Sequence, residues 1–137
     1  MSNTSETFLE YKSRVIDSKS ASFCGAKWYN ATIWLGHGET VSCHLPASHS
    51  IPLEELKENP SAIHNTLHKK NMRKMMLEGD RPSECYKCWQ VEDQGEDKIS
   101  ERVFKTIQYN VPTMYRGVIH YVLSYNGKQV TGKIIRN

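Results

Sequence analysis

A stretch rich in aromatic and β-branched residues surrounds a glycine turn in the first third of the chain. Residues 28–35 have the composition of a β-strand. The Gly-His-Gly turn at 36–38 can adopt positive φ, and residues 39–43 form the return strand. Pairing of the two strands would bring Cys24 and Cys43 toward the same end. The pattern therefore predicts a β-hairpin with two cysteines near its open end.

A second hairpin is predicted at the C-terminal end of the chain. Two runs with a high density of β-forming residues, 118–125 and 128–135, flank Asn126-Gly127. Asn-Gly between such runs is a strong short-range hairpin signal, because both residues tolerate the positive φ of a type I′ turn. We therefore assign residues 110–137 to a C-terminal hairpin region.

Apolar residues at helical spacing predict helices between the hairpins and before the first one. We expect a short helix over about 6–17, within an N-terminal arm of residues 1–22, although a frayed arm fits this pattern equally. A helical turn is expected at 53–58. A helix over 61–78, stopped by Gly79, is either covered on two sides or broken near Asn71. A further amphipathic helix begins near Asp97 or Lys98 and buries Ile99, Val103, Phe104 and Ile107.

Mixed helices and hairpins over 137 residues indicate a single α+β domain, 1–137. The net charge of +3 is weak evidence for a nucleic-acid partner, which normally selects a denser basic patch. The N-terminus has neither the basic nor the apolar region of a signal peptide, and no apolar run approaches the roughly 20 residues that span a bilayer. We expect a soluble protein of the reducing cytoplasm with no membrane association.

The candidate chemistry lies in the four cysteines of the chain. In a reducing compartment, spaced cysteines are more often metal ligands than disulfides. Four thiolates in a 2+2 arrangement can close either an iron–sulfur site or a structural zinc site. A whole hairpin separates the first pair, which is unusual for a zinc knuckle, and the second pair is a C-x-x-C. The candidate ligands are Cys24, Cys43, Cys85 and Cys88.

Other polar residues give weaker signals. His44 follows Cys43 and could donate a hydrogen bond to a sulfur, although an exposed loop histidine is the commoner situation. The basic run 68–74 is more often a solvated helix face than a binding site. No phosphate-binding glycine loop and no nucleophile elbow is present. The carboxylate pairs Glu54-Glu55 and Glu92-Asp93 have the pattern of ordinary surface residues.

The cysteine spacing resembles the auxiliary-cluster region of radical SAM proteins, the SPASM and twitch domains. Cys24, Gly38 and Cys43 fit the C-x13-G-x4-C hairpin signature of these domains, and Phe23-Cys24-x-x-x-Trp28 fits its opening. The segment 75–89, which ends in Cys85-Tyr-Lys-Cys88-Trp89, is similar to the helix and C-x-x-C that close the site. The similarity covers residues 23–109. It implies a small twitch-like fold that holds one [4Fe-4S] cluster through Cys24, Cys43, Cys85 and Cys88.

The chain lacks cysteine motifs that the longer members of this family carry, and this limits the function that we expect. The chain has no C-x-x-x-C-x-x-C for the cluster that cleaves S-adenosylmethionine, and no further cysteines for a second auxiliary cluster. We therefore expect no radical SAM enzyme activity, but a one-cluster protein for electron transfer or structural stabilisation, with a protein partner. Such an isolated module could be truncated or repurposed, for example in a viral genome. The alternative is a zinc-stabilised interaction module, with Lys69, Lys70, Arg73 and Lys74 contacting nucleic acid.

Overall fold

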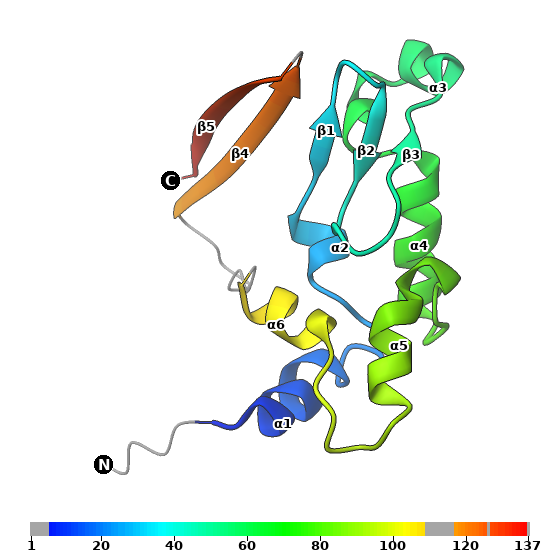
Figure 1. Ribbon diagram of the computed structural model, residues 1–137, viewed down its shortest axis with the longest axis vertical. Coiled ribbons are helices and arrows are strands. Elements are labelled where there is room, and N and C mark those ends of the chain that lie inside the picture. The colour runs from blue at the N-terminus through cyan, green and yellow to red at the C-terminus, as the bar shows by residue number, and fades with distance from the viewer. Residues whose placement is uncertain (1–5, 109–116, 126, 137) are drawn as a thin grey trace.

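The computed structural model describes residues 6–108, 117–125 and 127–136, and it confirms an α+β fold (Figure 1). The helices lie beside the β3 edge of the sheet and at one end of the molecule, and the two predicted hairpins are both present (Figure 1). The helices are α1 (Phe8–Tyr11), the π-helix η1 (Lys12–Ile16), α2 (Ala26–Tyr29), α3 (Leu53–Glu58), the 3₁₀-helix η2 (Pro60–Ile63), α4 (Leu67–Leu77), the 3₁₀-helix η3 (Ser83–Cys85), α5 (Tyr86–Glu92) and α6 (Glu101–Gln108). The strands are β1 (Thr32–Trp34), β2 (Glu39–Val41), β3 (His49–Ser50), β4 (Gly117–Tyr125) and β5 (Lys128–Arg136).

The sheet joins the two hairpins edge to edge, in the order β3-β2-β1-β4-β5 (Figure 1). β1 and β2 are antiparallel, as are β4 and β5, so both expected strand pairings are confirmed. The link between the hairpins is a parallel pairing of Ile33 with Leu123 and of Trp34 with Ser124. The short strand β3 adds an antiparallel edge to β2. Neither the parallel pairing nor β3 was predicted from the sequence.

The first strand begins later than its composition predicted. Trp28 lies in α2, not in a strand, because the chain turns helically immediately after Cys24. The N–H of Lys27 donates to the Cys24 carbonyl at 3.1 Å, and the Trp28 N–H donates to the Gly25 carbonyl at 3.0 Å. Tertiary packing overrides the β propensity, since the Trp28 ring packs against buried residues of both halves of the core. The predicted turn is confirmed, with Gly38 at φ 65°.

The middle helices differ from the prediction mainly in their boundaries. α3 occupies the predicted residues, but α4 begins at Leu67 and not at 61, because the Thr66 hydroxyl caps it by accepting from the Lys69 N–H at 3.2 Å. α4 continues without a break past Asn71. It is covered by the sheet, where Lys69 Nζ donates to Thr40 Oγ1 at 2.7 Å. Within the described ranges, no helix has the length and apolarity needed to cross a membrane.

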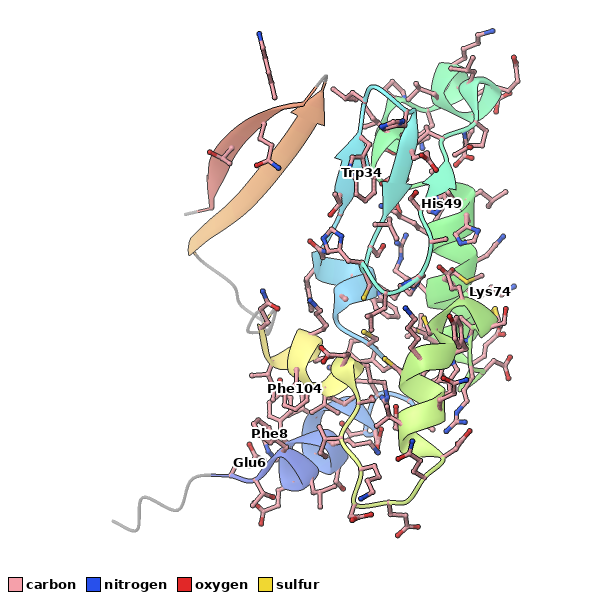
Figure 2. The ribbon with its side chains drawn as sticks, in the orientation of Figure 1. Glu6, Phe8, Trp34, His49, Lys74 and Phe104 are labelled. Atoms are coloured by element: carbon pink, nitrogen blue, oxygen red, sulfur yellow. The ribbon has the colours of Figure 1, made fainter. Side chains whose placement is uncertain are left out.

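α6 begins at Glu101, later than predicted, and only part of the predicted apolar face is buried, since Ile99 and Val103 pack into the core. Val103 is fully buried, but Phe104 is 40% exposed and Ile107 is 37% exposed. The buried positions beside Val103 are polar, namely Arg102 and Thr106. Phe104 instead meets Phe8 of α1 edge-on at the surface, with ring centroids 5.1 Å apart (Figure 2).

The reason for this orientation is the buried guanidinium of Arg102, whose side chain is 2% exposed. Its Nε and Nη2 donate to the two carboxylate oxygens of Glu92 on α5, both at 2.7 Å. Nη2 also donates to Asp17 at 2.9 Å, and Nη1 donates to the Phe23 carbonyl at 2.7 Å. One side chain therefore fastens α6 to α5, to the residue after η1 and to the segment that leads into α2.

Removing this guanidinium should destabilise the whole domain. We expect Arg102→Met to lower the free energy of unfolding by about 3–5 kcal/mol, because Glu92 would stay buried without its partner. Urea denaturation followed by circular dichroism measures the change. Lys57→Met is the matched control, since Lys57 pairs with Glu54 at the exposed surface and should leave stability unchanged. A stable Arg102→Met variant would contradict the structural role of this network.

The same ion pair should make stability depend on acidic pH. Burial alone would raise the pKa of Glu92, but hydrogen bonds and the charge of Arg102 outweigh burial and hold the pKa below its usual value of 4.5. The carboxylate therefore stabilises the fold above about pH 4.5, and this contribution is lost as the pH falls through the folded-state pKa. We expect the stability difference between the wild type and Glu92→Gln, measured by urea denaturation from pH 7 to pH 3, to narrow below about pH 4.5. For the exposed control Glu58→Gln the corresponding difference should stay constant.

Candidate metal centre

The four cysteines come from three separate parts of the chain and border one pocket. Cys24 precedes α2, Cys43 follows β2, and Cys85 and Cys88 lie at the junction of η3 and α5. The pocket between them is partly open to solvent, and all four residues line it. Cys24, Cys43 and Cys88 are buried, and Cys85 is half-buried at the rim. All four residues that the sequence indicated as ligands therefore line this pocket.

The segment carrying Cys24 is held on both sides by α6. The Phe23 carbonyl accepts from Arg102, and the Gly25 N–H donates to Thr106 Oγ1 at 2.8 Å. Gly25 also allows a close approach, since a Cβ at this position would lie 3.1 Å from the Thr106 Cα. Before Cys24, the Ser22 hydroxyl donates to the Met76 carbonyl near the end of α4 at 3.3 Å. These contacts fix the backbone position of Cys24.

The other cysteines are placed by local hydrogen bonds. Asn30, just after α2, donates its side-chain N–H to the Ser42 carbonyl, which ties the end of the hairpin to α2 next to Cys43. The indole N–H of Trp89 donates to the Pro82 carbonyl at 2.8 Å, which closes the turn leading into Cys85. Trp89 and Met76 are buried together with the cysteines and exclude water from the inner side of the pocket.

Burial makes the thiols hard to ionise. It raises the pKa of Cys24 to about 11, against a smaller lowering by the Ala26 backbone N–H. It raises the pKa of Cys85 to about 12, with Lys27 acting in the opposite direction. Burial also raises the pKa of Cys88, which the Arg102 backbone N–H partly offsets. These three groups are therefore neutral thiols at pH 7 in the metal-free protein, and binding a metal must release their protons.

Charged residues around the pocket are mostly basic. Lys27, Lys87, Arg102 and Lys105 are among the residues that line it, and Lys27 and Arg102 are buried. Glu101 is the acidic residue among those that line it. A basic lining compensates the negative charge of a thiolate-ligated metal. Sequence analysis missed Lys27 and Arg102, because only the folded chain shows that these cations lie beside the cysteines.

The donor set fits a four-thiolate site in kind and number, and the cysteines are free of disulfides. As placed, however, no group of three or more His, Cys, Asp or Glu side chains among the described residues has a geometry that could hold a metal ion. The residues that would hold the metal are Cys24, Cys43, Cys85 and Cys88.

No histidine whose side chain the structure describes lines this pocket. His44 is exposed, with its Nε2 3.4 Å from Thr32 Oγ1 and its ring edge-on to Trp34, and it is absent from the pocket lining. His44 is therefore an exposed loop histidine, the situation that the sequence favoured over a hydrogen bond to a cysteine sulfur. His49 and His68 stack 4.2 Å apart between β3 and α4, and the Nε2 of His68 is 2.7 Å from Glu84 Oε1.

The basic run of α4 is not a continuous solvated face. Lys69 is only 3% exposed and is directed into the sheet, where burial lowers its pKa to about 8. Arg73 is half-buried and hydrogen-bonded to the side chain of Asn65. Lys70 and Lys74 are exposed, and Figure 2 shows Lys74 at the outer side of α4. Of the four residues expected to contact nucleic acid in the alternative interpretation, Lys69 is therefore buried and Arg73 is half-buried.

Comparisons with known proteins identify no relative of this chain. No protein-family model matches it, and neither a search of curated proteins nor one of solved structures finds a match.

Proposed function

We propose that this chain is a small iron–sulfur protein that binds one [4Fe-4S] cluster through Cys24, Cys43, Cys85 and Cys88. The observation that carries the proposal is that four cysteines from distant parts of the chain border a single pocket. The resemblance of their spacing to the twitch domains of radical SAM proteins points to the same ligand set. The proposal covers electron transfer and structural stabilisation as the two uses of such a cluster.

Burial and charge support an iron–sulfur site in this pocket. The apolar side chains of Met76, Trp89 and Leu45 surround the thiols and limit solvent access, a condition that tunes the reduction potential of a cluster. The basic lining favours a metal centre with negative net charge. A cluster bound there would supply one-electron chemistry, with all of its protein ligands being cysteine thiolates.

The same ligand set argues against catalysis at the metal. Four cysteines complete the protein ligation of a [4Fe-4S] cluster, so no iron would keep an open position for a substrate. The absence of a C-x-x-x-C-x-x-C motif removes the S-adenosylmethionine-cleaving cluster. We therefore propose a non-enzymatic role, in which the protein exchanges electrons with a protein partner or uses the cluster to stabilise its fold. A four-thiolate zinc site is the competing occupant of the pocket.

Metal analysis of protein purified without oxygen tests this function. We expect about four irons and four sulfides per chain and a broad visible absorption. Cys88→Ala should lose the iron, because the ligand set would be incomplete, and should unfold at lower urea concentration than the wild type. His44→Ala is the matched control beside a proposed ligand, and it should keep both metal and stability.

Two results would contradict the proposal. One zinc per chain and no iron would make the pocket a structural zinc site. Full iron content in Cys88→Ala would show that the cluster does not use this ligand set.

A further inference from the structure

His49 holds the short strand β3 against the helix α4 (Figure 2). Its ring stacks on the ring of His68, the second residue of α4, with the centroids 4.2 Å apart. Its Nε2 lies 2.7 Å from Oγ1 of Thr66, the fully buried residue that caps the same helix. β3 has only two residues, so the backbone pairing with β2 is short and these side-chain contacts contribute much of what fixes the strand.

This arrangement accommodates a neutral His49 and not a protonated one. A protonated imidazole is a hydrogen-bond donor at both of its nitrogens. Nε2 can donate to Thr66 Oγ1, but Nδ1 is buried and has no hydrogen-bond partner among the described residues. A buried donor that lacks an acceptor costs free energy, because the donor has given up its hydrogen bond to water. The contacts that hold β3 therefore favour the neutral ring.

The charged groups around His49 also oppose a positive charge on its ring. His68 and Lys69 come from α4, Lys27 comes from α2, and the carboxylate among these neighbours is Glu84 of η3. Glu84 is already engaged, because its Oε1 lies 2.7 Å from His68 Nε2 and its Oε2 lies 3.5 Å from Lys27 Nζ. Burial, followed by the charges of His68 and Lys69, lowers the pKa of His49 from 6.5 to about 4.

We propose that His49 and its contacts with α4 form an acid-sensitive latch, which holds β3 in place at neutral pH and releases it when His49 takes up a proton from solvent. The pKa of His49 is lower in the closed state than in water, so the stability of the closed state is fully present above about pH 6.5 and is lost as the pH falls toward 4. β3 ends the segment that carries Leu45 and Pro46, which line the cysteine pocket, so the latch restrains one side of that pocket.

Hydrogen exchange of the full-length protein, followed amide by amide by NMR and corrected for the intrinsic pH dependence of exchange, tests the latch. The reporter is the amide of Ile51, which follows β3 and donates to the Gly38 carbonyl at 2.7 Å. Between pH 8 and pH 5 the open population at this amide should rise by about tenfold or more, because the open state binds the proton more tightly. The buried amide of Gly25, which donates to Thr106 Oγ1, reports unfolding of the whole domain. At each pH, Ile51 should open more often than Gly25.

A neutral substitution at the latch gives the matched comparison. His49→Gln removes the titrating ring and keeps a polar side-chain end within reach of Thr66, so the open population at Ile51 should no longer rise between pH 8 and pH 5. His37→Gln removes an exposed histidine in the turn between β1 and β2, and it should keep the wild-type pH dependence. If His49→Gln does not fold, the comparison of Ile51 with Gly25 in the wild type decides alone.

Three results would overturn the latch. The first is an open population at Ile51 that is equal at pH 8 and pH 5. The second is an Ile51 amide that exchanges together with Gly25 at every pH, because β3 would then open only when the whole domain unfolds. The third is a His49→Gln variant that keeps the wild-type pH dependence, because another group would then be the one that titrates.

Discussion

The buried guanidinium of Arg102 is the interaction on which the rest of this small domain depends. It holds α6 against Glu92 of α5, Asp17 after η1 and the Phe23 carbonyl, with every contact between 2.7 and 2.9 Å. Burying a cation costs free energy unless all of these partners are present. The segments that carry the partners must therefore be in place together for the domain to fold. In the part of the chain whose side chains the structure describes, the buried apolar residues form two small clusters, one around Ile16 and one around the cysteines. An ionic network that joins them gives the fold a definite arrangement that so small a core could not specify alone.

The geometry of the cysteine pocket depends on this network. The residue before Cys24 is bonded to Arg102, and the residue after it is bonded to Thr106, one turn later on α6. Cys88 lies on the same helix as Glu92. The segments that bring thiols together are thus the segments that the guanidinium fastens. Burial in this pocket raises the pKa values of Cys24, Cys85 and Cys88.

The sequence by itself determined the features that depend on neighbouring residues. The glycine turn before β2, the helical turn α3 and the C-terminal Asn-Gly hairpin all follow from local backbone preferences, and all are present. The sequence also indicated the set of four cysteines, because spacing along the chain is enough to suggest a ligand set. The N-terminal segment is helical over α1 and η1, although its composition also fitted a frayed arm.

Tertiary structure alone decided the features that depend on partners far away in the chain. Trp28 has strand propensity but is helical, because its ring fills the junction between the two core clusters. α6 buries Arg102 in place of the apolar Phe104, since carboxylates from two other segments surround the guanidinium. Lys69 belongs to a basic run but is buried, because Thr40 Oγ1 and the His64 carbonyl accept hydrogen bonds from its ammonium. A polar side chain can be buried only where such partners exist, and hydrophobic periodicity does not record where distant segments will place them.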